Sequence, residues 1–267
     1  MLHRYVYGVD FSGASDAGKF IWIAEGALDG ADLCVMNCYP AEALDDSGRP
    51  RHLALTALSK LIASSEESVF GFDFPFSLPN AQLRTLTWLD FARAFGKRYP
   101  TAEVFYSKHG GKGNEQRRIT DERAKPPFAP ANLRMYRQTY YGIRDLLAPL
   151  ALSGQACVLP MMKAKPSKPW LIETCPAVTL RNLDLRLVQY KERGDSGYER
   201  RATILQGLET IGVHLADEAL RTRVLENERG DALDSVIAAL GTARALQAGT
   251  LAEANDPVIR REGWIYP

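Results

Sequence analysis

The sequence predicts an α/β protein built on a mixed β-sheet of about five strands. Three observations lead to this fold class. Residues 1–40 hold three strand-like segments separated by turns, a helix-like segment then precedes a strongly apolar fourth strand, and strand-like and helical segments return in the second half of the chain. Among 267 residues, 46% are hydrophobic and 24% charged, so the chain can bury a full core without disulfide bonds. We expect a single domain over residues 1–267.

The first three strands are expected to form an antiparallel meander. They correspond to RYVYGVDF, KFIWIAEGAL and DLCVMNCYP, which are rich in β-branched and aromatic residues. Leucines then recur at largely helical spacing over residues 51–64, and SVFGFDFPFSLP has the apolar composition of a short buried strand. Because a helix connects it to the earlier strands, this fourth strand is expected to run parallel to the first.

The segment from about residue 81 to residue 152 has the composition of an insertion that combines helices with a basic loop. Within it, YSKHGGKGNEQRRITDERAKPPFAP has no apolar period, which predicts a mobile loop. Strand-like sequence returns at QACVLP and PWLIETCPA, and residues 198–226 are predicted to be helical. The last helix is expected to begin at GDALDSVIAALG, since its leucine, valine and isoleucine residues form a stripe at helical spacing.

Composition also excludes several classes of function. The formal net charge is only +1, from 33 basic and 32 acidic residues, so any site for a polyanion must be local. The N-terminal residues do not resemble a signal peptide, and no apolar run is long enough to cross a membrane, so we expect a cytoplasmic protein. The four cysteines and four histidines lack zinc-site spacing, and the cysteines are expected to be reduced thiols. The sequence leaves open whether the chain forms a homodimer.

Five acidic residues are candidates for a functional site. Asp10 ends the strand YVYGV beside Ser12 and Gly13, where it could also serve as a turn residue. Asp73 lies in the apolar string VFGFDFPF, where an unpaired charge would cost several kcal/mol, so it should have a partner. Glu173 ends the strand WLIE. Asp231 and Asp234 open the last helix, where acids also satisfy free backbone amides and the helix dipole.

Taken together, these acids predict a metal site. They lie at the ends of two or three strands and at the start of one buried helix. Carboxylates gathered in one cleft repel one another unless they are protonated or neutralised by a cation. A set of oxygen ligands favours Mg²⁺ or Mn²⁺ over zinc.

The segments GVDFSGA, GFDFPFSLP, IETCPA, GDALDSVIAALGTARAL and EGWIYP together resemble a family of uncharacterised proteins known as predicted ribonuclease H-like nucleases. The resemblance spans nearly the whole chain and implies a ribonuclease H-like fold. In that superfamily, which includes Holliday-junction resolvases, acids from the first strand, a later central strand and the last helix hold divalent metals. The resemblance gives this catalytic and metal-binding role to Asp10, Asp73, Asp231 and Asp234, with Glu173 as a further metal ligand.

One departure from the family pattern decides the type of arrangement. Bacterial ribonuclease H enzymes place a glutamate on the first helix. In this sequence, residues 47–65, which include the expected first helix, contain no acidic residue. The arrangement implied is therefore resolvase-like, with the second acid on the fourth strand. Such a nuclease uses one metal ion to activate a water molecule and a second to stabilise the leaving oxygen, and Asp10 would bridge both ions.

A nuclease also needs cations that hold the nucleic-acid backbone, and the basic loop could supply them. The candidate phosphate ligands are Lys108, Lys112, Arg117, Arg118, Arg123 and Lys125. The alternative for this loop is a solvated insertion without a binding role, because Glu115, Asp121 and Glu122 dilute its charge.

Parts of the sequence also bear on three other functions: nucleotide binding by a P-loop, phosphotransfer, and binding without catalysis. GASDAGK has P-loop spacing, but Phe20 stands where a serine or threonine should bind magnesium, and the segment joins two apparent strands. An actin-like or sugar-kinase phosphotransferase shares the ribonuclease H-like core but needs two such cores, and no second glycine-rich copy is present. A non-catalytic binding module would use the same carboxylates only as caps and turn residues. Bound divalent metal and ATP binding distinguish these alternatives.

Overall fold

The structure is a computed structural model in which the sheet dominates the architecture. It describes residues 5–84, 87–111, 113–186, 188–249, 251 and 254–266. Within these residues the sheet has the strand order β5-β6-β4-β1-β2-β3-β7, and β8 pairs with β6. None of the described helices is long and apolar enough to cross a membrane. All four cysteines are free thiols, and Cys34 is the one that is not fully buried.

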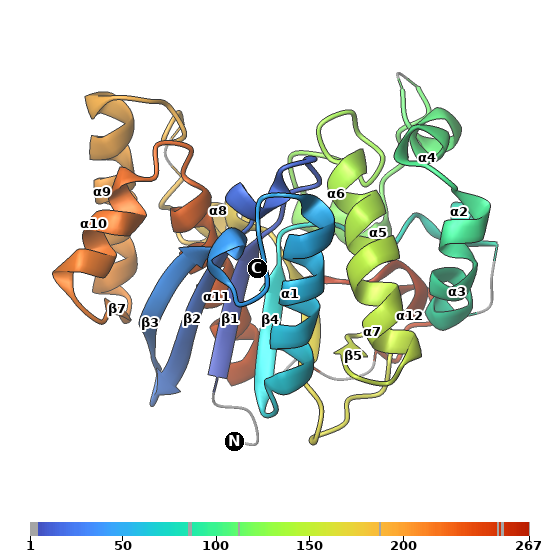
Figure 1. Cartoon of the computed structure of the whole chain (residues 1–267), viewed down its shortest axis with the longest axis horizontal. Coiled ribbons are helices and arrows are strands. Elements are labelled where there is room, and N and C mark those ends of the chain that lie inside the picture. Colours follow the sequence, from blue (N-terminus) through green and yellow to red (C-terminus); the bar gives the residue numbers. More distant parts are fainter. Residues whose placement is uncertain are drawn as a thin grey trace.

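The first four strands have the predicted directions. β2 (Trp22–Asp29) pairs antiparallel with both β1 (Tyr5–Asp10) and β3 (Asp32–Pro40), which forms the predicted meander. β4 (Ser68–Phe72) runs parallel to β1, and β6 (Trp170–Thr174) runs parallel to β4. The predicted α/β fold, a mixed sheet flanked by helices, is confirmed (Figure 1).

The sheet is wider than predicted because three short strands extend it. These are β5 (Cys157–Val158), β7 (Val213–Leu215) and β8 (Ile265–Tyr266). β7 interrupts the region that was predicted to be continuously helical, which consists of α9 (Asp195–Thr210), β7 and α10 (Glu218–Glu226). Gly212 ends the first helix with a φ of +94°, a conformation that favours glycine.

Helices cover both faces of the sheet (Figure 1). α1 (Arg51–Ser64) has the predicted bounds and packs on one face together with helices of the insertion. α11 (Asp231–Gln247) packs on the other face together with α9, α10 and α8 (Pro176–Asn182). The contact between β1 and α11 is made by backbone atoms, since a Cβ atom added to Gly8 would lie 2.0 Å from the Ser235 carbonyl oxygen. The first strand and the last long helix are thus held at minimal separation.

The segment predicted to be an insertion lies between β4 and β5, and it contains several helices. Its helices are α2 (Asn80–Leu83), α3 (Trp88–Arg98), α4 (Ala102–His109), α5 (Ile119–Ala124), α6 (Tyr136–Tyr141), the π-helix η3 (Gly142–Leu147) and α7 (Ala148–Leu152). The remaining described elements are the 3₁₀ turns η1 (Ala17–Lys19) and η2 (Ala41–Ala43) and the helix α12 (Ile259–Glu262).

The segment predicted to be a mobile loop contains one of these helices. α5 buries Thr120 and Asp121, and Arg118 immediately before it is fully buried. The prediction missed this helix because the segment is anchored by charged side chains rather than by an apolar stripe.

Candidate functional site

The alternation of side chains along the strands decides which acids can meet. On β1, Tyr7 and Val9 belong to the core beneath α1, whereas Val6 belongs to the core beneath α11. Successive strand residues point to opposite faces, so Asp10 falls on the face of α11. Gly8 pairs with Gly71 in the parallel register, which extends to place Asp73 beside Asp10, and the Asp73 amide donates to the Val9 carbonyl at 3.0 Å.

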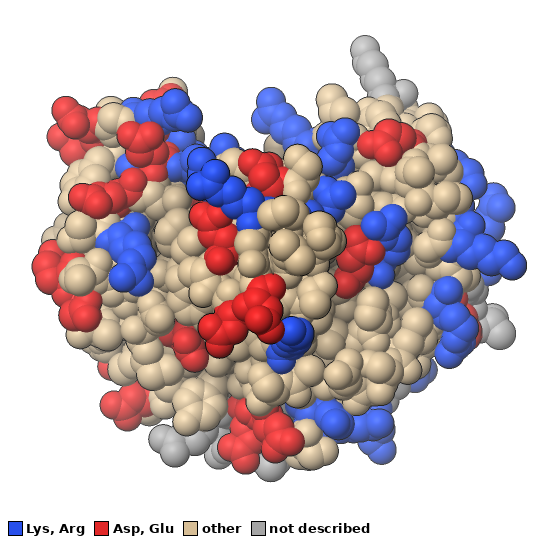
Figure 2. Space-filling view, viewed as in Figure 1, with Lys and Arg blue, Asp and Glu red and all other residues tan. Residues whose placement is uncertain are grey.

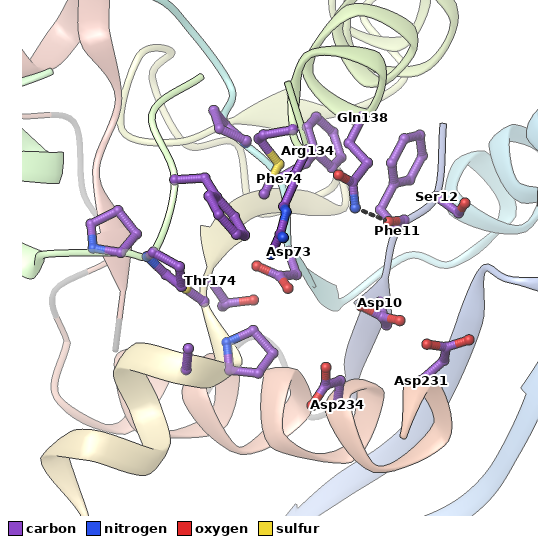
Figure 3. A pocket seen from close by; sticks show the side chains of 18 of the residues that line it. Asp10, Phe11, Ser12, Asp73, Phe74, Arg134, Gln138, Thr174, Asp231 and Asp234 are labelled. Atoms are coloured by element: carbon purple, nitrogen blue, oxygen red, sulfur yellow. Dashed lines mark hydrogen bonds between the residues drawn. The ribbon is translucent and has the colours of Figure 1, made fainter. Parts of the chain in front are cut away.

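The first turn of α11 brings two further acids to the same place. The helix begins after Gly230, whose φ is +75°, and Asp231 and Asp234 are three residues apart, which puts them on one side of the helix. Both side chains are buried. Figure 3 shows Asp10, Asp73, Asp231 and Asp234 directed into one space, and all four line a pocket of about 640 Å³.

The charged forms of Asp10, Asp73 and Asp231 are destabilised in this pocket. Burial raises the pKa of Asp10 well above its ordinary value, and Asp234, Asp231 and Asp73 raise it further, while Lys191 opposes them. Burial, followed by the charge of Asp234, raises the pKa of Asp73 to about 7. Burial also raises the pKa of Asp231, although Arg229 counteracts it. The pocket therefore favours an added positive charge.

Two of the acids already have a cationic partner. Lys191 forms an ion pair with Asp234, and the Tyr190 hydroxyl donates to the same carboxylate at 2.8 Å. The Arg229 guanidinium lies 3.1 Å from the Asp231 carboxylate. In contrast, the Asp10 side chain is only 8% exposed, and its carboxylate has no hydrogen bond or ion pair with any residue that the structure describes.

The donor set fits a divalent cation in kind, because it consists of carboxylate oxygens in a repelling group, and the buried Asp10 carboxylate has no partner among the described residues. The carboxylate oxygens are not arranged as a preformed metal site. Across the described ranges, no three His, Cys, Asp or Glu side chains are arranged as a group that could hold a metal ion. Two of the four carboxylates are instead paired with basic side chains, Asp234 with Lys191 and Asp231 with Arg229.

Glu173 lines the same pocket and contributes to the raised pKa of Asp73, but its carboxylate is bound by other residues. Its register partner on β4 is Phe72, which packs beneath α1, so the Glu173 side chain points to the opposite face from Asp10. There it accepts hydrogen bonds from the Phe76 amide at 3.0 Å and from Arg118 at 2.7 Å. Burial raises the pKa of Glu173, and the Arg118 charge lowers it.

The basic residues predicted to hold phosphate are distributed differently from the acids. Arg118 is fully buried and pairs with both Asp121 and Glu173, so its charge is already neutralised. The other described candidates are exposed and do not line the pocket; they are Lys108, Arg117, Arg123 and Lys125. Lys112 lies outside the described residues.

The pocket instead has basic residues that the sequence reasoning missed. Arg134, Arg193 and Arg229 are exposed side chains that line it together with Lys191. Figure 2 shows the molecule hollowed at the top of the view, with Lys and Arg side chains on both sides of the hollow. Aromatic rings accompany two of the arginines: Arg229 lies 4.4 Å from the ring centre of Phe20, and Arg134 lies 5.6 Å from that of Phe128.

A short sequence signal could have identified two of these residues. The tetrapeptide Glu-Arg-Gly-Asp occurs at 192–195 and again at 228–231, each time directly before a helix. The glycine of each copy has a positive φ, +79° at Gly194 and +75° at Gly230. Each glycine is the N-cap residue of the helix that follows. The two turns contact each other through Arg193 and Glu228, which are 3.7 Å apart.

Comparisons with known proteins give one family and one solved structure. Residues 8–258 match the model of a family described as "Protein of unknown function (DUF429)". The crystal structure of the yeast mitochondrial Holliday junction resolvase Ydc2 aligns with 92% of this chain and 83% of its own, at 8% identity and a TM-score of 0.41. A search of curated proteins gives no match.

Proposed function

The chain belongs to the DUF429 family, and we propose that it is a divalent-metal-dependent nuclease that hydrolyses nucleic-acid phosphodiester bonds. One observation carries this proposal: four carboxylates from the ends of β1 and β4 and the start of α11 line one pocket, and one of them, the buried Asp10, has no partner among the described residues. A purely structural acid at this depth should be hydrogen-bonded, because burial of an unpaired charge is unfavourable.

Asp10, Asp73, Asp231 and Asp234 would hold Mg²⁺ or Mn²⁺. When bound, such ions activate a water molecule and stabilise the leaving oxygen of a phosphodiester. Asp10 lies among the other three acids (Figure 3) and is the residue best placed to contribute to more than one ion.

The exposed arginines of the pocket would bind the substrate backbone. Arg193 and Arg229 stand on adjacent turns, and Arg134 comes from the segment before α6. Guanidinium groups bind phosphate oxygens in a bidentate manner, and this contact is independent of base sequence. The half-buried rings of Phe20 and Phe128 offer surfaces on which a base can stack.

Cleavage assays on matched variants test the proposal. Asp10→Asn and Asp234→Asn keep the size of the side chain and remove the charge that binds metal. Each should reduce cleavage in Mg²⁺ or Mn²⁺ at least about 100-fold over a panel of single-stranded, duplex and branched substrates. Asp46→Asn, an exposed acid whose partner is Lys60, should retain activity.

Thermal melting in EDTA controls for misfolding. Removal of one charge from a repelling cluster should leave the metal-free Asp10→Asn protein at least as stable as wild type. Unchanged cleavage in both variants, or destabilisation of both with no Mn²⁺ bound to wild type, would instead favour a non-catalytic binding module.

A further inference from the structure

Lys191 is the cation that pairs with Asp234 in the acidic pocket. Its ammonium group pairs with Asp234, whose side chain is 1% exposed, while the Lys191 side chain is itself 49% exposed. Tyr190 donates a hydrogen bond to the second oxygen of the same carboxylate, so both Asp234 oxygens are engaged. The Lys191 charge also lowers the pKa of Asp10, against the larger effect of burial, which raises it. One protein-derived cation thus faces two acids that are proposed metal ligands.

The backbone that carries Lys191 is fixed in place. Arg201 on α9 is 1% exposed and donates hydrogen bonds to the carbonyls of Tyr190 at 2.9 Å and Glu192 at 3.1 Å, the two neighbours of Lys191. The same guanidinium donates to the Leu225 carbonyl at 2.8 Å, just before the turn that starts α11. At Gly197 an added Cβ atom would lie 1.8 Å from the Glu192 carbonyl oxygen, so this segment lies directly on α9.

We propose that Lys191 is a built-in counter-ion that occupies the carboxylate cluster in the metal-free protein and is displaced from Asp234 when a divalent cation binds. This inference rests on the proposed metal-binding role of the aspartates. It follows from competition for the same oxygens: a cation that needs Asp234 must remove the ammonium group that now holds it. Because Arg201 fixes the backbone and half of the side chain is exposed, only the side chain has to move.

Lys191 is accordingly a positioning residue that sets the metal affinity of the site. A fixed ammonium group keeps the acids together without metal and raises the metal concentration that the protein needs. A divalent ion brings twice the charge to the same carboxylates, so at sufficient concentration it displaces the Lys191 ammonium group.

Titration of the whole protein with Mn²⁺ tests this inference. We expect Lys191→Met to bind Mn²⁺ about tenfold more tightly than wild type, measured by calorimetry and by the electron paramagnetic resonance signal of free Mn²⁺, because a competing charge is gone. Lys191→Arg retains the charge and should restore weak binding. Lys60→Met removes an exposed lysine that pairs with Asp46 elsewhere and should behave as wild type.

Amine labelling of the wild-type protein gives a second readout that needs no variant to fold. Mn²⁺ should increase the rate at which Lys191 reacts with an acylating reagent, measured by peptide mass spectrometry, and should leave the rate at Lys60 unchanged. Equal Mn²⁺ affinity in wild type and Lys191→Met, or slower labelling of Lys191 with Mn²⁺, would overturn the inference. If neither protein binds Mn²⁺, or if binding survives Asp10→Asn, the proposed metal site fails as well.

Discussion

Asp73 makes the stability of the protein depend on pH. Its pKa is raised from 3.8 to about 7 in the folded protein, first by burial and then by Asp234, so folding favours the protonated form. The stabilisation associated with this proton is complete below pH 3.8 and is lost as the pH rises through about 7. The loss should amount to roughly 4 kcal/mol at most, at about 1.4 kcal/mol per unit.

Asp73→Asn should remove this dependence. Urea unfolding in EDTA at intervals between pH 4 and pH 8 should show the variant gaining stability relative to wild type as the pH rises, and the gain should level off above about pH 7. Parallel stability curves for the two proteins would show that the Asp73 carboxyl is not shifted in this way.

The side-chain direction of the acids could not be obtained from the sequence. Asp10, Asp73 and Glu173 all end strands that are buried on both faces, and such strands are apolar throughout rather than alternating. The register supplies what composition lacks, because it places Asp10 and Asp73 on one face and Glu173 on the other. The group of four aspartates was predicted from the residues and the family resemblance, and their assignment as metal ligands remains a proposal.

At the level of elements, the ion pairs of Arg118 fasten α5 to the sheet. The guanidinium contacts Asp121 at the start of α5, Glu173 on β6 and the Glu262 carbonyl at the end of α12. Glu262 in turn accepts hydrogen bonds from the Asn80 and Ile119 amides. This buried network joins the insertion to the last residues of the chain.

Arg118→Met should therefore destabilise the protein by about 3–5 kcal/mol, because two buried carboxylates would lose their partner. The neighbouring Arg117 is exposed and donates one hydrogen bond to the Pro126 carbonyl, so Arg117→Met should change stability by less than about 1 kcal/mol. Urea unfolding at pH 7 measures both. Similar values for the two variants would mean that the Arg118 network does not support the fold.

Long elements were easier to predict than short ones. α1 and the start of α11 lie where the apolar spacing placed them, because a helix of several turns repeats its pattern often enough to be recognised. β7 has three residues and α5 has six, which is too short for a period. One of the two acidic partners of Arg118, Glu173, lies 55 residues away on β6, so no local pattern indicates this ion pair.

For the whole molecule, the arginines that line the pocket predict how binding of nucleic acid depends on salt concentration. Each phosphate contact contributes about 0.7 to the slope of log K against log salt for single strands and about 0.9 for duplex DNA. The double variant Arg193→Gln/Arg229→Gln should therefore reduce the slope by roughly 1.4 or 1.8, respectively, when binding is measured in EDTA.

The matched control for this measurement is Arg49→Gln/Arg93→Gln, which removes two exposed arginines that pair with Glu42 and Asp90 and do not line the pocket. Its slope should equal that of wild type. An equal reduction in both double variants would indicate a diffuse effect of net charge rather than contacts at the hollow.

The backbone contact at Gly8 has a consequence for how the pocket can open. A strand and a helix that touch without intervening side chains cannot slide or tilt without a clash. The part of the backbone that carries Asp10, Asp231 and Asp234 is therefore one rigid unit. The opposite side is different, because Tyr190, Lys191 and Arg193 stand on a connecting segment that Arg201 fastens through carbonyl groups. Substrates of unequal width would then be accommodated by movement of the exposed Lys191 and Arg193 side chains, while the backbone on both sides of the pocket keeps its position.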